Sequence, residues 1–403
     1  MSKQGKTGAS RRRVLGGIAA TAGIAAASAF VPARFAIGQA AKIKLGLMLP
    51  YTGTYAALGK NIDDAMRLAI AEAGGKLGGR EIEYAVVDDE SEPAKGTENA
   101  NKLVTRDKVD FLIGTVHSGV AAAMVKVAKD NDTMLIIPNA GVDAATGALC
   151  GPNIFRTSFS NWQPGFATGK FAADRKWKRA VVISWDYAAG KESTGGFKDG
   201  FTAGGGTIEK ELFLPFPQVA FQPLLTEIAS IKPDVVYAFY AGGGAVSFVK
   251  DYFAAGLRKT IPLVGPGFLT DGTLEAQGES AQGLETALHY ADDLPNPKDK
   301  EFRAAFKKAT NRDADVYAVQ GYDTGQLLVA GLAAVKGDVG ARKDLVAAME
   351  KATIDSPRGK FTLSKAHNPV QDFYLRKVEG TQNKYVSVAV KALSDPAKGC
   401  KMA

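Results

Sequence analysis

The feature that most constrains the fold of this chain is a repeated alternation of short β-branched runs and longer amphipathic segments. The run IKLGLML (43–49) precedes GKNIDDAMRLAIAEAGG (59–75), in which apolar residues recur at helical spacing. The same order of a strand-like run and a helix-like segment continues through 81–138 and resumes through 179–266. Such alternation is typical of parallel sheets with helices on both faces, so we predict an α/β fold.

The alternation extends too far for one sheet, and it pauses at FRTSFSNWQP (155–164). Further crossings are predicted near ALHYADDLPNP (287–297) and LSKAHNP (363–369). We therefore predict two doubly wound parallel-sheet lobes joined by a three-strand hinge. The first lobe would contain residues 41–160 plus 291–365, and the second residues 161–290 plus 366–403. Open parallel sheets bind ligands beyond the carboxyl ends of their strands, so a cleft between the lobes is expected.

The first forty residues have the zones of an export signal, namely a basic start, an apolar run and small residues before Lys42. Arg11 and Arg12 resemble the pair of a twin-arginine signal, and an ordinary secretory signal is the alternative. The apolar run is rich in Ala and Gly and barely reaches the length of a spanning helix, which argues against a membrane anchor. We predict a signal peptide at 1–40, of the twin-arginine (Tat) type.

Removing this segment changes the charge of the chain. It holds six of the 50 basic residues and no acidic residue, which leaves 44 basic against 42 acidic residues. A nearly balanced mature chain gives no electrostatic reason to bind nucleic acid.

The chain has two cysteines, Cys150 and Cys400. An exported protein with an even cysteine count can form a disulfide, and we predict one between them. Two separate thiols are the alternative.

The sequence lacks the residues that several kinds of catalytic and metal-binding sites require. The three histidines have no metal-ligand spacing, and Ser118 lies in VHSGV without the turn motif of a hydrolase nucleophile. Two glycine-containing turns, at 53–61 and 114–120, depart from the phosphate-loop pattern. We therefore expect no enzyme, no metal and no cofactor.

What remains is a strand-to-helix turn suited to an anion. In DFLIGTVHSGVA (110–121) a buried strand ends and a helix begins near Ser118, whose N-terminal amides and hydroxyl would bind a carboxylate. In LIIPNAG (135–141) the next strand ends and presents amides at Asn139, Ala140 and Gly141. Two neighbouring strand ends would converge on one carboxylate. A simple helix cap at Ser118 is the alternative.

These segments resemble the periplasmic ligand-binding proteins of branched-chain amino acid-type ABC importers. The resemblance covers nearly the whole mature chain, including GTYAALGKNIDDAMRLAI, LIGTVHSGVA, IIPNAG, IFRTSFSNWQ, DVVYAFYAGGGAVSFVKDYFAAGL and VGPGF. It implies a two-lobed fold with a closing cleft, in which Ser118 and the backbone near Ala140 hold a ligand carboxylate.

The departures from the family pattern concern the ligand. Where amino acid binders carry an acidic residue for the ligand ammonium, this chain has Gly267, and a family tyrosine falls on Ala189. A buried ammonium without an anion costs several kcal/mol, so an amino acid would need Asp186 or Asp271 as a substitute partner. The segments PNAG, FRTSFSNWQ and DYAAGK also resemble those of the family branch that takes up aromatic acids.

We therefore predict a periplasmic solute-binding protein that captures a benzoate- or cinnamate-type carboxylate for an ABC permease. Tyr187, Trp185 and Tyr240 would sandwich the ring, Tyr55 would line the cleft, and His117 would reach a ring substituent or pack. We expect a monomer without nucleic-acid partners. The alternatives are a binding protein for branched-chain or other amino acids, and a ligand sensor that docks on a membrane receptor.

Overall fold

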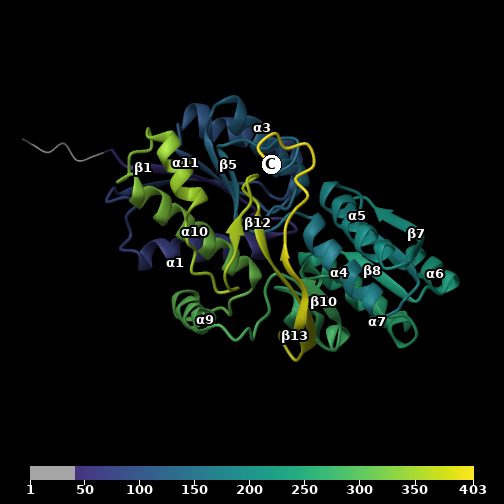
Figure 1. Cartoon of the computed structure of the whole chain (residues 1–403). Coiled ribbons are helices and arrows are strands. Elements are labelled where there is room, and N and C mark those ends of the chain that lie inside the picture. The colour runs from purple at the N-terminus through teal and green to yellow at the C-terminus, as the bar shows by residue number, and fades with distance from the viewer. Residues whose placement is uncertain (1–40) are drawn as a thin grey trace, which may run out of the picture. The chain divides into compact units, whose positions relative to one another are not determined.

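The computed structural model describes residues 41–403, and the predicted export signal lies outside the described residues. Within 41–403, no helix is both long and apolar enough to cross a membrane. Two sheets organise this part of the chain (Figure 1).

The first sheet is built from the first five strands, all parallel, in the order β2-β1-β3-β4-β5. Their bounds are β1 Ile43–Leu49, β2 Ile82–Asp88, β3 Phe111–Gly114, β4 Met134–Ile137 and β5 Ile154–Arg156. The central strands are buried on both faces, as the continuous apolar runs of the sequence predict.

Helices cover both faces of this sheet. On one face Met66 of α1 and Leu328 of α10 pack with strand residues such as Ile113, and on the other Val125 of α3 packs with Leu112. The helices of this lobe are α1 Ala56–Glu72, α2 Pro93–Asn101, α3 Ser118–Asp130, α10 Val316–Ala334 and α11 Arg342–Glu350, with α9 Pro297–Thr310 packed against α1.

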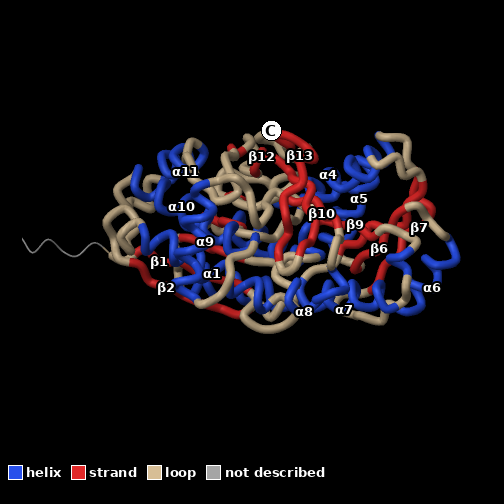
Figure 2. The backbone as a smooth tube through the Cα atoms, turned by 90° about the horizontal axis from the view of Figure 1, so that it is seen from below, coloured by secondary structure: helices blue, strands red, loops and turns tan. Residues whose placement is uncertain are grey.

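The second sheet has a parallel part in the order β7-β6-β8-β9-β10. The strands are β6 Arg179–Trp185, β7 Thr207–Leu214, β8 Val235–Phe239, β9 Leu263–Pro266 and β10 Glu285–Leu288. Helices α4 Trp162–Asp174 and α5 Ala188–Ala203 lie on one side of these strands, and α6 Gln222–Ile231, α7 Gly242–Ala254 and α8 Leu274–Gln277 lie on the other (Figure 2). The two doubly wound parallel-sheet lobes agree with the prediction.

An antiparallel extension of the second sheet was not predicted. Strand β12 (Pro369–Glu379) pairs with β10, and β11 (Thr362–Leu363) and β13 (Gln382–Leu393) pair with β12. β12 alternates buried and partly buried residues over most of its length, and most residues of β13 are partly or fully exposed, so neither has the continuous apolar run that identifies the parallel strands.

As far as β12, the chain crosses between the lobes at the three predicted places, after β5, after β10 and before β12. Two of these crossings are hydrogen-bonded side by side: Arg156 Nε donates to Asn368 Oδ1 (2.8 Å), and Gln371 Nε2 donates to Ser158 O (2.7 Å). Hydrogen bonds between two of the crossing segments therefore join them into one hinge.

The C-terminal end differs from the predicted lobe boundary. Residues 366–403 were assigned to the second lobe, but after β13 the chain returns to the first, where Cys400 forms a disulfide with Cys150. Figure 1 shows the C-terminus near α3 and β5. Lobe assignment by strand pattern misses this tail because residues 394–403 contain no strand or helix.

Candidate ligand-binding site

A small, nearly filled cavity lies between the lobes, at the carboxyl ends of the parallel strands. It is lined from the first lobe and its crossing by Tyr55, Leu58, Val116, Ser118, Asn139, Gly141, Phe159, Asn161 and Tyr317, and from the second lobe by Tyr187, Ala189, Phe239, Ala241 and Phe268. Parallel strands end at one edge, which is why turns far apart in sequence meet here.

Ser118 is the first residue of α3, and its hydroxyl lies in the cavity wall. The Nδ2 of Asn161 donates to Ser118 Oγ at 3.1 Å. That contact orients the serine and leaves its O–H proton for an acceptor in the cavity. The N-cap role belongs to His117, whose Nδ1 accepts from Gly119 N at 3.0 Å.

The turn after β4 presents alternate amides. Asn139 and Gly141 line the cavity, and within residues 41–403 their backbone N–H groups have no hydrogen-bond partner. Ala140 was predicted to join them, but its N–H donates to Thr115 O at 2.9 Å. The N–H of Ala140 is therefore not available to a ligand, whereas those of Asn139 and Gly141 are.

Gly141 also explains the tight fit of this wall. A Cβ at this position would lie 2.4 Å from Asn161 Oδ1 and 2.6 Å from Phe159 Cε2. Glycine is therefore required for the turn to lie against the crossing segment.

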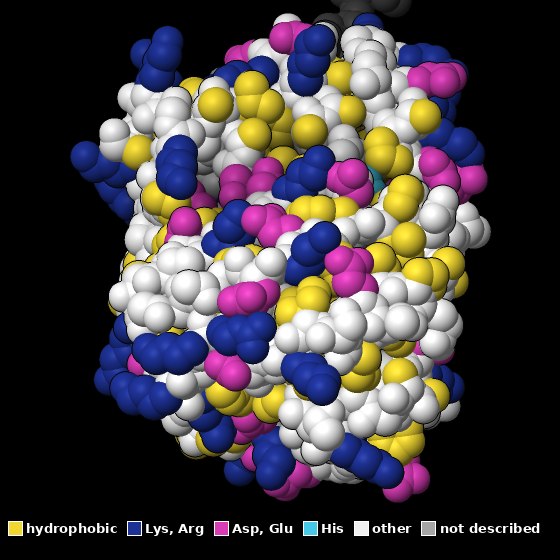
Figure 3. Space-filling model, turned by 90° about the vertical axis from the view of Figure 1, so that its right-hand side faces the viewer, with side chains coloured by type: hydrophobic (Ala, Val, Ile, Leu, Met, Phe, Trp, Pro, Cys, Tyr) yellow, Lys and Arg dark blue, Asp and Glu magenta, His cyan; other side chains and the backbone are white. Residues whose placement is uncertain are grey.

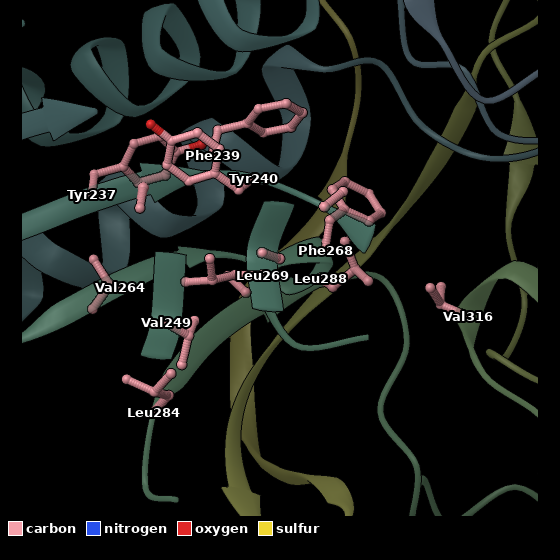
Figure 4. Packing of buried hydrophobic residues seen from close by; sticks show 14 of the residues in the cluster. Tyr237, Phe239, Tyr240, Val249, Val264, Phe268, Leu269, Leu284, Leu288 and Val316 are labelled. Carbon is pink, nitrogen blue, oxygen red and sulfur yellow. The ribbon is translucent and has the colours of Figure 1, made fainter. Parts of the chain in front are cut away.

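Aromatic side chains form the rest of the wall. The hydroxyl of Tyr55, from the start of α1, lies 2.9 Å from that of Tyr187 in the second lobe, so the cleft is closed here. Phe159 packs on Phe268 with ring centroids 4.7 Å apart. Figure 4 shows Phe268 beside Phe239, which follows from their places at the ends of neighbouring strands.

Three predicted ring contacts lie behind this wall. Trp185 is fully buried, donates Nε1–H to Gln218 O (2.8 Å) and does not line the cavity. Tyr240 packs edge-on against Trp185 at 5.1 Å. His117 stacks on Tyr187 at 4.7 Å. Of the predicted sandwich, only Tyr187 faces the cavity, because Trp185 and Tyr240 belong to the packing beneath it.

His117 is neutral in this position. Burial lowers the pKa of its imidazole to about 4, and no carboxylate contacts it. Since Nδ1 accepts from Gly119 N, the ring proton is on Nε2, which is buried without a partner among the described residues. The side chain supports Tyr187 and does not reach the cavity itself.

Gly267 does not border the cavity, contrary to the prediction. A Cβ there would lie 2.2 Å from Arg376 Nη2 and 2.7 Å from Leu288, so the space beside it is already filled. The two substitute anions are occupied elsewhere. Asp271 is buried against Arg376 (2.7 Å), and Asp186 is exposed and paired with Lys191 (2.7 Å).

The resulting cavity carries no formal charge of its own. Among residues 41–403, its lining includes no Asp, Glu, Lys or Arg side chain. The same part of the chain contains no cluster of His, Cys, Asp and Glu suited to a metal ion. On the outer face in Figure 3, in contrast, basic and acidic side chains lie among one another.

Sequence reasoning missed several lining residues: Leu58, Val116, Phe159, Asn161, Phe239, Ala241 and Tyr317. Most are apolar residues whose local pattern resembles that of any core position. Tyr317 has a buried hydroxyl without a partner among the described residues, and it begins a helix far along the chain from the other turns. Only the packing of α10 against α1 brings it to the cavity.

A profile of the family described as periplasmic binding protein matches residues 42–383. A Leu/Ile/Val-binding protein homolog 6 from Brucella melitensis biotype 1 is 29% identical over 345 residues, which cover 83% of this chain and 87% of that protein.

Two solved structures are more similar. A solute-binding protein of an ABC transporter from R. palustris, in complex with benzoate, is 53% identical, with a TM-score of 0.87 over 90% of this chain and 100% of that chain. One from Rhodopseudomonas palustris BisB5, in complex with 3,4-dihydroxybenzoic acid, is 33% identical, with a TM-score of 0.83 over 88% and 99%.

Proposed function

Because the chain belongs to the periplasmic binding protein family, we propose that it is the exported, periplasmic solute-binding component of an ABC importer and that it captures a benzoate- or cinnamate-type aromatic carboxylate. Residues 1–40 would serve as its export signal, and an ABC permease would receive the ligand. The relatives named above, which are solute-binding proteins, support this role.

The observation that most supports an aromatic carboxylate as the ligand is that, among residues 41–403, no Asp, Glu, Lys or Arg side chain lines the cavity. A carboxylate needs hydrogen-bond donors, and Ser118 with the free amides of Asn139 and Gly141 provides them. An amino acid also brings an ammonium, which would be buried without an anion at a cost of several kcal/mol. An apolar ring, in contrast, matches Phe159, Phe239 and Phe268.

Ligand capture would then proceed by closure. A carboxylate enters the open cleft and binds the first lobe at the end of β4 and the start of α3. The second lobe closes over the ring with Tyr187 and Phe268. The contact between the hydroxyls of Tyr55 and Tyr187 (2.9 Å) describes how near the lobes come in the closed form.

A thermal-shift screen tests the ligand class. Benzoate, 4-hydroxybenzoate and cinnamate are compared with leucine and valine on the protein lacking residues 1–40. A bound ligand at a hundred times its Kd adds roughly 2.7 kcal/mol to the free energy of unfolding. We expect this stabilisation from at least one aromatic acid and from neither amino acid. Stabilisation by leucine or valine alone would refute the aromatic assignment and favour the amino acid alternative.

Ser118→Ala is expected to weaken benzoate binding about ten- to a hundred-fold, because it removes one hydrogen bond to a charged group worth about 1.5–3 kcal/mol. The amides of Asn139 and Gly141 remain, so binding should weaken without vanishing. Calorimetry on Ser118→Ala and on the control Ser247→Ala, a partly exposed serine on α7, makes the comparison. Equal affinities in both variants would show that Ser118 only supports Asn161.

A further inference from the structure

Three carboxylates from separate parts of the chain meet beside the cavity. Asp143 follows β4 in the first lobe, Glu192 lies on α5 in the second lobe, and Asp395 lies in the C-terminal tail. None of them lines the cavity. Glu192 connects the lobes, because its Oε2 accepts the backbone N–H of Asp143 at 3.1 Å. Asp143 also contacts the second lobe, since its Oδ1 accepts the backbone N–H of Trp162 at 3.1 Å.

Glu192 is also linked to Ser118 in the cavity lining through the side chain of Asn161. Its Oε2 accepts from Asn161 Nδ2 at 2.7 Å, and the same nitrogen donates to Ser118 Oγ at 3.1 Å. The Asn161 backbone N–H donates to Gly141 O at 2.7 Å. A second-lobe carboxylate therefore holds the asparagine that orients the serine, and through the backbone N–H of Asp143 it also contacts the first lobe.

More acidic than basic side chains surround this contact. Burial, followed by the charges of Glu192 and Asp395, raises the pKa of Asp143 above its usual range, and burial also raises the pKa of Glu192. The other groups that face the pair are Arg156, which lowers both values, and the neutral hydroxyl of Tyr187. Glu192 accepts two N–H groups, whereas Asp143 accepts one, from the backbone of Trp162. The charged form is therefore favoured more at Glu192, and Asp143 is the one that holds the proton.

We propose that Glu192 is a positioning residue that latches the second lobe onto Asp143 and Asn161 and fixes Ser118 for the ligand, and that the latch closes with a proton on Asp143. The inference rests on the proposed function in that it assumes ligand capture by closure. It adds a residue outside the cavity and a dependence of closure on pH.

The direction of the pH dependence follows from the geometry. Opening the lobes removes Glu192 and admits water, so the pKa of Asp143 falls towards its usual value near 4. The closed form thus binds a proton that the open form releases. Closure is stable at low pH and is lost as the pH rises through the raised pKa of Asp143, by up to about tenfold per pH unit for one proton.

The experiment compares wild type with Glu192→Gln, Glu192→Ala and Asp143→Asn. Asp199→Asn, which removes an exposed carboxylate from the same helix, is the control. Benzoate affinity is measured by calorimetry at about pH 5.5 and about pH 9, which bracket the proton uptake. The distance between spin labels at exposed Val86 and Phe253, one on each lobe, reports closure without any ligand.

Wild type and Asp199→Asn should bind benzoate more weakly and open more at about pH 9. Glu192→Gln and Asp143→Asn keep the hydrogen-bond acceptors without the repulsion, so both should remain closed and bind with a much flatter pH profile. Glu192→Ala loses the acceptor and should bind about tenfold more weakly at both pH values.

The outcomes separate this inference from the proposed function. If wild type ignores benzoate but its label distance responds to pH and the Gln and Asn variants flatten that response, the ligand assignment fails and the latch stands. If the label distance and pH profile of Glu192→Gln match those of wild type, or Glu192→Ala closes normally, the latch is refuted whatever the ligand.

Discussion

Replacing Arg376 by methionine is expected to lower the free energy of unfolding by about 3–5 kcal/mol, because it leaves Asp271 as an unpaired buried carboxyl group. The Arg376 guanidinium is fully buried and donates to Asp271 Oδ2 (2.7 Å) and Tyr290 O (2.9 Å). Urea unfolding measures the loss. The surface pair of Arg175 with Glu285 provides the control, since Arg175→Met should cost less than about 1 kcal/mol.

The loss in Arg376→Met should grow with pH. Burial already raises the pKa of Asp271 to about 7 in the wild type, against the opposing charge of Arg376, and removing that charge raises it further. A raised pKa means that the folded variant holds a proton that the unfolded chain releases above about pH 4, so stability falls as the pH rises. The double variant Arg376→Met/Asp271→Asn should recover part of the loss and lose the pH dependence. A double variant no more stable than the single one would contradict this explanation.

Replacing both Cys150 and Cys400 by serine is expected to cost about 2–5 kcal/mol of unfolding free energy. The disulfide joins residues 250 positions apart, so in the chain-entropy account it restricts the unfolded chain strongly. Urea unfolding of the oxidised wild type, the reduced wild type and the double variant measures the effect. The reduced protein and the variant should agree, and a variant as stable as the oxidised protein would contradict the prediction.

The sequence allowed the parallel strands to be predicted closely. The run 43–49 is β1, and the second series of alternating segments, predicted to begin at residue 179, begins with β6 at Arg179. These elements are recognisable because burial on both faces produces continuous apolar runs, which are a local property of the chain. The β12–β13 hairpin was missed because its strands are partly exposed and pair through contacts distant in sequence.

The candidate site likewise has features that a local sequence pattern predicts and features that it does not. By itself the sequence determined where the turns that line the cavity lie, because a strand end followed by Ser118 or by Asn139 and Gly141 places polar donors at a sheet edge. Only the tertiary structure decided which neighbours face the ligand space. Trp185 is packed behind Tyr187, and Arg376, from a strand more than a hundred residues away, fills the space beside Gly267. A residue type sets what chemistry is possible, but the direction of a side chain depends on the packing of segments distant in sequence, and no local pattern contains that information.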